Sequence, residues 1–258
     1  MAKRPRRRQQ RGNRLNTSFA ASYPPRVPVR WVKFVFGLFL LPPCYILTAA
    51  FFSALTHATV HQFYRAPEFL WFSGGAAFWL ALYFFLPHPL LVYVFGHELT
   101  HTLAVYLAGG QVSRFRVGRD GGHIVSNKIN TWIALSPYFI PIYSVIVIGV
   151  YAGLSLFYDV APYRHILYLM VGATWAFHAT FTITMIGKGQ TDLAYGGTFF
   201  SLLVIYLMNL LLLTFMLLLA TPQQDGFVQF LHDLEHLFAD FCLTAEITLR
   251  ALWRAGRL

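Results

Sequence analysis

The feature that most constrains this chain is the long, almost uncharged stretch from Phe69 to Gly109. A helix needs about 20 apolar residues to cross the hydrocarbon core of a bilayer, and this stretch has room for two such helices. Pro87-His88-Pro89 interrupts it near the middle, where proline disfavours a continuing helix. The stretch therefore predicts two membrane-spanning helices joined by a short turn, with a single kinked and tilted crossing as the alternative.

The rest of the chain contains further runs of the same character. The sequence is 57% hydrophobic and only 12% charged, which lies outside the range of soluble domains. We therefore expect an all-α, multi-pass integral membrane protein, most simply of the cell membrane, with about five or six transmembrane helices in a membrane domain at residues 31–220. The additional candidate spans are Trp31–Leu55, with Pro42-Pro43 breaking or kinking it, Trp132–Tyr158, Tyr163–Gly187 and Gly196–Ala220.

The N-terminal arm, residues 1–30, is basic and rich in proline. Residues 1–33 contain no Asp or Glu, so the net charge of +10 belongs to this end of the chain. Such a segment cannot bury enough apolar surface to fold alone, and we expect it to be disordered. Next to a hydrophobic span, a basic segment favours contact with anionic lipid headgroups over a role in binding nucleic acid, so no nucleic-acid partner is expected.

The stretch Gly96-His97-Glu98-Leu99-Thr100-His101 places three ionisable side chains inside an apolar run, where each is costly unless it is paired or bound. In a helix, His97 and His101 lie on one face, and Glu98 lies about 100° further round the axis. This is the H-E-x-x-H pattern, in which two imidazoles bind zinc and the carboxylate accepts a proton from the zinc-bound water. The alternative, paired core histidines with a structural Glu98, is disfavoured because no solvated face surrounds them.

A catalytic zinc ion needs three protein ligands, so one more side chain is required. Asp192 is favoured, because a carboxylate is a normal zinc ligand and the polar stretch Lys188 to Asp192 opens a later helix. An ordinary role at a helix N-terminus is the alternative for that carboxylate. His178 is the competing third ligand, although a lone histidine within a span is more often a hydrogen-bonded core residue.

Two segments outside the spans have distinct patterns. Val112 to Val117 alternates apolar and polar residues, and Asp120-Gly121-Gly122 supplies turn residues before His123 to Ser126. This pattern predicts a short β-hairpin, with an ordinary interhelical loop as an equally weighted alternative. Ser136 to Pro141 contains two prolines that open the helix of that span.

The C-terminal segment, residues 221–258, is expected to form an amphipathic helix lying on the membrane surface. Apolar residues from Phe227 to Phe241 recur at helical spacing, with acids and histidines opposite them. His232-Asp233-Leu234-Glu235-His236 also matches the inverted H-x-x-E-H pattern and is a rival metal site. It is the weaker candidate, because its polar residues belong to a plausible solvated face.

The remaining histidines and cysteines carry less information. His57 and His61 have helical spacing but belong to a flanking, interfacial segment. Cys44 and Cys242 support neither a disulfide framework nor a cysteine metal site.

Together, these elements resemble the site-2 protease family of intramembrane zinc metalloproteases, over about Val94 to Asn209. The resemblance implies that His97 and His101 bind zinc, that Glu98 is the catalytic base and that Asp192 is the third ligand. Two departures are that Thr191-Asp192-Leu193 replaces the usual Leu-Asp-Gly, and that the chain has no room for the PDZ domain that many members contain.

The function expected from this sequence is hydrolysis of peptide bonds in transmembrane protein substrates, with one Zn²⁺ per chain and its bound water activated by Glu98. The alternative from another class is a catalytically silent, zinc-containing membrane protein with a binding or regulatory role. A zinc-dependent lipid hydrolase would use similar chemistry but has no supporting motif.

Overall fold

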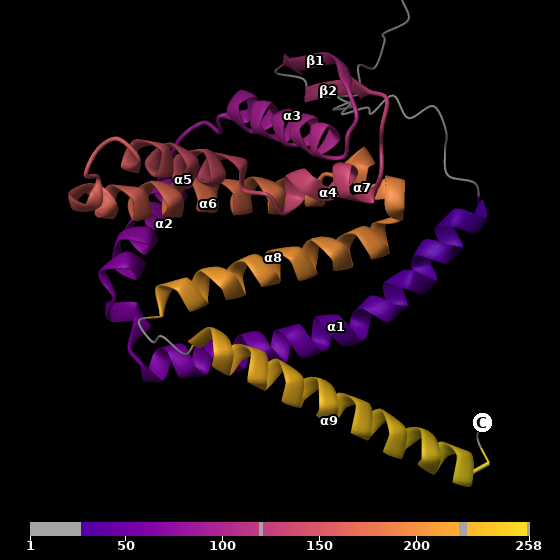
Figure 1. The fold of residues 1–258 in the computed structure, drawn as a ribbon. Helices are drawn as coiled ribbons and strands as arrows, with labels where there is room; N and C mark the ends of the chain where they lie inside the picture. The colour runs from indigo at the N-terminus through magenta and orange to yellow at the C-terminus, as the bar shows by residue number, and fades with distance from the viewer. Residues whose placement is uncertain (1–26, 119–120, 222–225, 257–258) are drawn as a thin grey trace, which may run out of the picture.

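The computed structural model describes residues 27–118, 121–221 and 226–256, and the greater part of the basic arm lies outside these ranges (Figure 1). These residues form a mainly helical protein with one two-stranded sheet. In chain order the elements are α1 Val27–Val60, η1 Phe63–Arg65, α2 Pro67–Phe85, α3 Leu90–Leu107, β1 Val112–Gly118, β2 Gly121–Ser126, α4 Thr131–Leu135, η2 Ser136–Tyr138, α5 Ile142–Ser155, η3 Ala161–Tyr163, α6 Arg164–Gly187, α7 Thr191–Gly196, α8 Thr198–Ala220 and α9 Gly226–Arg254.

Five of the described helices are long and apolar enough to cross a membrane, and the number rises to six if a bent helix pair forms one span. The five are α1, α2, α3, α6 and α8, which agrees with the predicted number of spans. The predicted turn at Pro87-His88-Pro89 separates α2 from α3, so the long apolar stretch forms two helices and not one kinked crossing.

Of the two effects expected at Pro42-Pro43, a break and a kink, the break does not occur: α1 continues through both prolines as one helix of 34 residues. Proline removes backbone hydrogen bonds from a helix, but its fixed φ angle is compatible with helical geometry. Beyond the prolines, Ala50, Ala54 and Ala58 are buried at helical spacing in a cluster with Leu210 of α8. Small side chains allow close packing of the two helices, and this packing supports α1 past the prolines.

The span predicted from Trp132 to Tyr158 is broken. The helical pair Thr131–Tyr138 and Ile142–Ser155 is bent by 80° at Phe139 to Pro141. Pro137 and Pro141 lack the backbone N–H groups that would continue the helix. Asn209 of α8 donates its side-chain N–H to the Tyr138 carbonyl at 2.9 Å, which satisfies one acceptor at the break.

The predicted hairpin is present and lies against α3 (Figure 1). β1 and β2 pair antiparallel, with Phe115 opposite Ile124 and Arg116 opposite His123, and an irregularity in register falls between Val112 and Arg114. Ile124 is buried in a cluster with Val105 of α3. The inner surface of the hairpin therefore covers the helix that carries the H-E-x-x-H motif.

Close contact between α2 and α6 depends on two glycines. A Cβ atom at Gly172 would lie 1.9 Å from the Phe72 carbonyl oxygen, and one at Gly75 would lie 1.9 Å from the Leu169 carbonyl oxygen. Only hydrogen at these positions lets the two backbones approach so closely, as is common between membrane helices. Helix α6 is thereby held where its other face meets α3.

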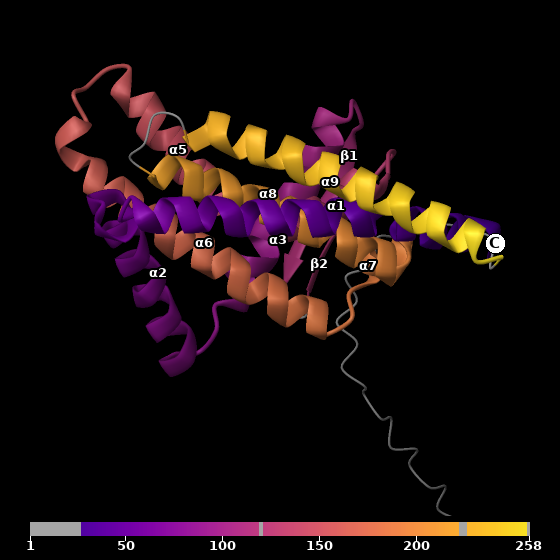
Figure 2. The ribbon, with the colours of Figure 1, turned by 90° about the horizontal axis from the view of Figure 1, so that it is seen from below.

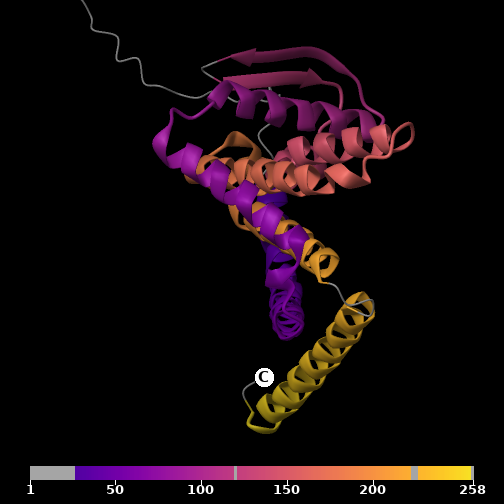
Figure 3. The ribbon, with the colours of Figure 1, turned by 90° about the vertical axis from the view of Figure 1, so that its left-hand side faces the viewer.

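Helix α9 extends from Gly226 to Arg254, within the C-terminal segment predicted to form an amphipathic helix. Its first turns pack on α1 and α8 through Phe230, and its C-terminal part projects away from the other helices (Figures 1 and 3). Figure 2 shows α9 running beside α1. The Asp233 carboxylate accepts hydrogen bonds from Ser53 of α1 at 2.7 Å and from Gln229 at 2.8 Å. Burial raises the pKa of Asp233, but these bonds and nearby His57 and His232 lower it more, so the pKa lies below its ordinary value.

Candidate metal centre

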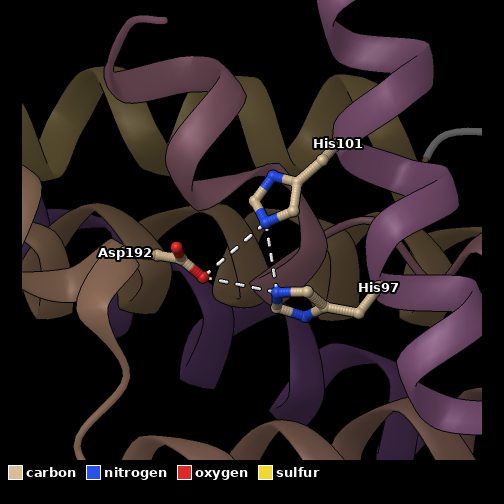
Figure 4. A group of neighbouring side chains, drawn as sticks. All are labelled: His97, His101 and Asp192. Carbon is tan, nitrogen blue, oxygen red and sulfur yellow. Dashed lines mark hydrogen bonds and ion pairs between the residues drawn. The ribbon is translucent and has the colours of Figure 1, made fainter. Parts of the chain in front are cut away.

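Helix α3 presents His97 and His101 on one face, as the spacing predicts. Both residues are buried, at 6% and 1% exposure, and their Nε2 atoms lie 3.1 Å apart. Gly96 lets Tyr143 of α5 pack closely on α3, because a Cβ atom there would lie 2.7 Å from the Tyr143 ring. The two imidazoles therefore converge on one point inside the protein (Figure 4).

Asp192 reaches the same point from the first turn of α7, with the side chain 2% exposed. Its Oδ2 atom lies 3.3 Å from Nε2 of His97 and 3.6 Å from Nε2 of His101 (Figure 4). The side chain does not serve as a helix N-cap, since that position belongs to Gln190. The structure thus brings together the three residues proposed from the sequence as metal ligands, across 95 positions of the chain.

The three ligand atoms fit a single metal ion. Separations of 3.1, 3.3 and 3.6 Å place them on a circle of radius about 1.9 Å, so one ion can lie about 2.0 to 2.1 Å from all three. The other carboxylate oxygen, Oδ1 of Asp192, is buried with no hydrogen-bond partner among the described residues. Two imidazoles and one carboxylate form a donor set typical of a catalytic zinc site, with a fourth position left for water or substrate.

Outer hydrogen bonds orient each imidazole so that Nε2 faces the metal position. Nδ1 of His101 lies 2.8 Å from the Ile133 carbonyl oxygen, and Nδ1 of His97 lies 3.1 Å from the Tyr93 hydroxyl. A proton on each Nδ1 leaves a lone pair on each Nε2, which is the tautomer that a metal requires. The side chain of Asn130 accepts a hydrogen bond from Ile133 N–H at 2.8 Å and so fixes the short helix α4 that carries the carbonyl.

Asp192 is also held from outside the ligand group. The Tyr138 hydroxyl donates a hydrogen bond to its Oδ2 at 3.1 Å. Burial raises the pKa of the Asp192 carboxyl, but its contacts with His101 and His97 lower it more, so the net shift is downward. A downward shift favours the ionised carboxylate, which is the form that binds a cation.

Glu98 lies beside the ligand group and under the hairpin. Its side chain is 3% exposed, and a Cβ atom at Gly122 of β2 would lie 2.6 Å from its Cγ. A cavity of about 10 Å³, close to the space of one water molecule, separates it from the ligands. The cavity is lined by His97, Glu98, His101, Gly122, His123, Ile124 and Asp192.

His178, the alternative third ligand, does not belong to the group of ligand atoms. It is buried on α6 and shares a separate small cavity with His97 and Pro137. Its Nε2 atom has no hydrogen-bond partner among the described residues. The structure therefore favours Asp192 over His178 as the third ligand.

The other histidines considered from the sequence lie elsewhere. His57 is exposed at the end of α1, 3.7 Å from the Asp233 carboxylate, and His61 is exposed after that helix. His232, Glu235 and His236 occupy the exposed face of α9. None of them joins the metal centre in the part of the chain that the structure describes.

Sequence reasoning did not identify the residues that support the ligands. Tyr93 could have been found, because it precedes His97 by one helical turn and its side chain must share that face. Tyr138, Ile133 and Gly122 come from other elements, and no local pattern relates them to the motif.

Comparisons with protein-family models, with curated proteins and with solved structures gave no match. The functional argument therefore depends on the geometry and chemistry of the site.

Proposed function

We propose that this protein is an intramembrane zinc metalloprotease that hydrolyses peptide bonds of transmembrane protein substrates. The observation that carries the proposal is the meeting of Asp192 with His97 and His101 in a group that could hold a metal ion, next to Glu98. The group is buried within a protein that has five apolar helices long enough to cross a membrane. An enzyme with this layout would act at or below the membrane surface.

Zinc is the metal that we propose, with one ion per chain. Two imidazoles and a carboxylate suit Zn²⁺ better than Mg²⁺ or Ca²⁺, which prefer oxygen ligands alone. Zinc supplies Lewis acidity and a water molecule whose pKa is close to neutral. His97, His101 and Asp192 would hold the ion, while Tyr93, Tyr138 and the Ile133 carbonyl would keep the three side chains in place.

Glu98 is the proposed general base. It lines the same small cavity as the three ligands, so a water molecule there would lie close to its carboxylate. The carboxylate accepts a proton from this water during attack on the peptide carbonyl and delivers it to the leaving amine. Its burial excludes bulk water, which would otherwise compete for the same hydrogen bonds.

The hairpin is the proposed binding surface for the substrate chain. β2 lines the cavity with Gly122, His123 and Ile124, and within the described ranges of the chain no further strand pairs with either side of the two-stranded sheet. An extended peptide can add to such a strand through main-chain hydrogen bonds, which also unwinds a helical substrate. Because Gly122 covers Glu98, the hairpin must shift for a substrate to reach the base.

Resemblance to the site-2 protease family supports the same activity. The quoted motifs supply the two histidines, the glutamate and a later aspartate that this family would use. The replacement of Leu-Asp-Gly by Thr191-Asp192-Leu193 does not prevent Asp192 from reaching the histidines.

A catalytically silent zinc protein of the same fold is the second candidate. The observation in its favour is the closed cover of the site, since Glu98 is only 3% exposed beneath Gly122. A binding or regulatory protein could keep the metal for stability and never open. The presence of Glu98 itself favours the enzyme, because metal binding alone does not require a base there.

The test is the Glu98→Gln variant in purified, membrane-reconstituted protein supplied with transmembrane peptides. We expect cleavage to fall by about 10²- to 10⁴-fold, the usual contribution of a general base, while the metal content stays unchanged. Glu246→Gln, which alters an exposed glutamate on α9, is the matched control and should retain full activity. Equal cleavage by Glu98→Gln and wild type would remove the proposed mechanism, and no cleavage by wild type on any peptide would favour the silent protein.

A further inference from the structure

Helix α9 carries a second pair of histidines that the proposed function does not use. His232 and His236 are one turn apart on its exposed face. Their Nε2 atoms lie 3.2 Å apart, with ring centroids separated by 4.3 Å. Both rings therefore direct the same nitrogen toward one point at the surface.

The spacing of this pair matches that of the histidine pair in α3. The Nε2 atoms of His97 and His101 are 3.1 Å apart, against 3.2 Å in α9. With metal–nitrogen distances of about 2.0 to 2.1 Å, a separation of 3.2 Å corresponds to an angle of roughly 100° at the metal. That angle lies between octahedral and tetrahedral values, so the separation suits binding of one ion by both nitrogens.

The charge around the pair also favours a cation. From Gly226 to Ala245 the chain contains three acidic residues and no Lys or Arg; the acids are Asp233, Glu235 and Asp240. Asp233 interacts electrostatically with His232 while it accepts the hydrogen bond from Ser53. A divalent ion at the histidine pair would lie in a negative potential, with water free to fill its remaining positions.

We propose that His232 and His236 chelate a divalent transition metal ion, of the Zn²⁺, Ni²⁺ or Cu²⁺ class, at the surface of α9. Imidazole nitrogens select these borderline ions over Mg²⁺ and Ca²⁺. This site is separate from the α3 centre, differs from it in being exposed and in having two protein ligands, and does not depend on the proposed protease activity. With two ligands instead of three, its affinity is the lower of the two.

An N–H···N hydrogen bond between two neutral imidazoles would give the same separation, and such a pair would show no selective metal binding. The two explanations differ in a direct measurement. Chelation requires both imidazole rings, so replacing either histidine abolishes it. Scattered single histidines would instead each contribute to metal binding independently of the others.

The experiment uses the full-length protein in detergent without a polyhistidine tag, dialysed against increasing free Ni²⁺. Wild type is expected to bind one equivalent more than His232→Gln/His236→Gln, whatever the α3 centre holds. Each single variant, His232→Gln or His236→Gln, should weaken this equivalent by about tenfold or more, because the second imidazole acts at high effective concentration.

The control is His61→Gln/His165→Gln, which removes two exposed histidines from other surfaces and should bind as wild type does. All four histidines are exposed, so these replacements leave the core packing intact. Cu²⁺ added to wild type should in addition show an electron paramagnetic resonance spectrum with coupling to two nitrogens. Equal Ni²⁺ binding by wild type and His232→Gln/His236→Gln would overturn the proposal, as would an equal loss in the control.

Discussion

Replacing Asp192 by alanine should remove most of the metal, because its Oδ2 atom supplies one of the three ligand positions, 3.3 and 3.6 Å from the two imidazole nitrogens. Loss of an outer hydrogen-bond partner weakens metal binding by about 10- to 100-fold, so loss of a ligand should weaken it by about 100-fold or more. At free zinc about ten times the wild-type Kd, occupancy should then fall from about 90% to about 10% or less. Equilibrium dialysis with elemental analysis measures this directly, and peptide cleavage should be lost as well.

Three further variants separate the role of the ligand from effects on folding. Asp192→Asn keeps the size of the side chain and should also lose the metal. Tyr138→Phe removes only the hydroxyl that donates to the carboxylate at 3.1 Å, so an intermediate occupancy of about 50% is expected for a tenfold loss in affinity. His178→Ala should keep the metal, since its imidazole lies outside the ligand group. Retained metal in folded Asp192→Ala together with its loss in His178→Ala would refute the assignment.

Three predictions concern other parts of the molecule. Gly172→Leu should prevent folding or lower the free energy of unfolding by several kcal/mol, because the new Cβ atom would lie 1.9 Å from the Phe72 carbonyl oxygen. Circular dichroism during heating measures this loss of stability. Gly122→Val should displace the hairpin from Glu98 and increase hydrogen exchange in β2, with unchanged exchange counting against the contact. Because the folded-state pKa of Asp233 is lowered, its stabilisation of the α1–α9 contact is present above the ordinary value of about 4 and is lost as pH falls through the folded-state value. Hydrogen exchange of α9 amides, corrected for intrinsic rates, should show that the free energy of opening α9 falls by about 1 kcal/mol over this pH range. The same change should be absent in Asp233→Asn.

The spans and the histidine pair in α3 could be predicted because their signals are local. A run of apolar residues indicates a membrane helix by its length, and a spacing of four places two histidines on one helical face. The position of Asp192 was a preference only, since its approach to His97 joins residues 95 positions apart. No periodic pattern encodes such a contact.

The prolines show where local rules are insufficient. Pro42 and Pro43 stay inside α1, whereas Pro137 and Pro141 accompany a bend of 80°. The difference lies in what surrounds each pair. Packing on α8 supports the continuous course of α1, while at the bend Asn209 satisfies the Tyr138 carbonyl. Tertiary partners therefore decided between a continuous and a broken helix, and the sequence of each segment did not contain that information.

The two histidine pairs depend on the fold to different extents. The α9 pair needs only one helical turn, so it should persist wherever α9 stays helical. The α3 centre also needs α7 in place, and two hydrogen bonds hold α7. Lys33 of α1 donates to the Tyr195 carbonyl at 3.4 Å, and Ser201 of α8 donates to the Leu193 carbonyl at 3.0 Å. A chain that loses these contacts keeps two imidazoles but not the carboxylate, and its α3 pair becomes equivalent to the pair on α9. Metal binding at the α3 centre would therefore be linked to folding of the helices around it, because an ion would prefer the state in which all three ligands meet.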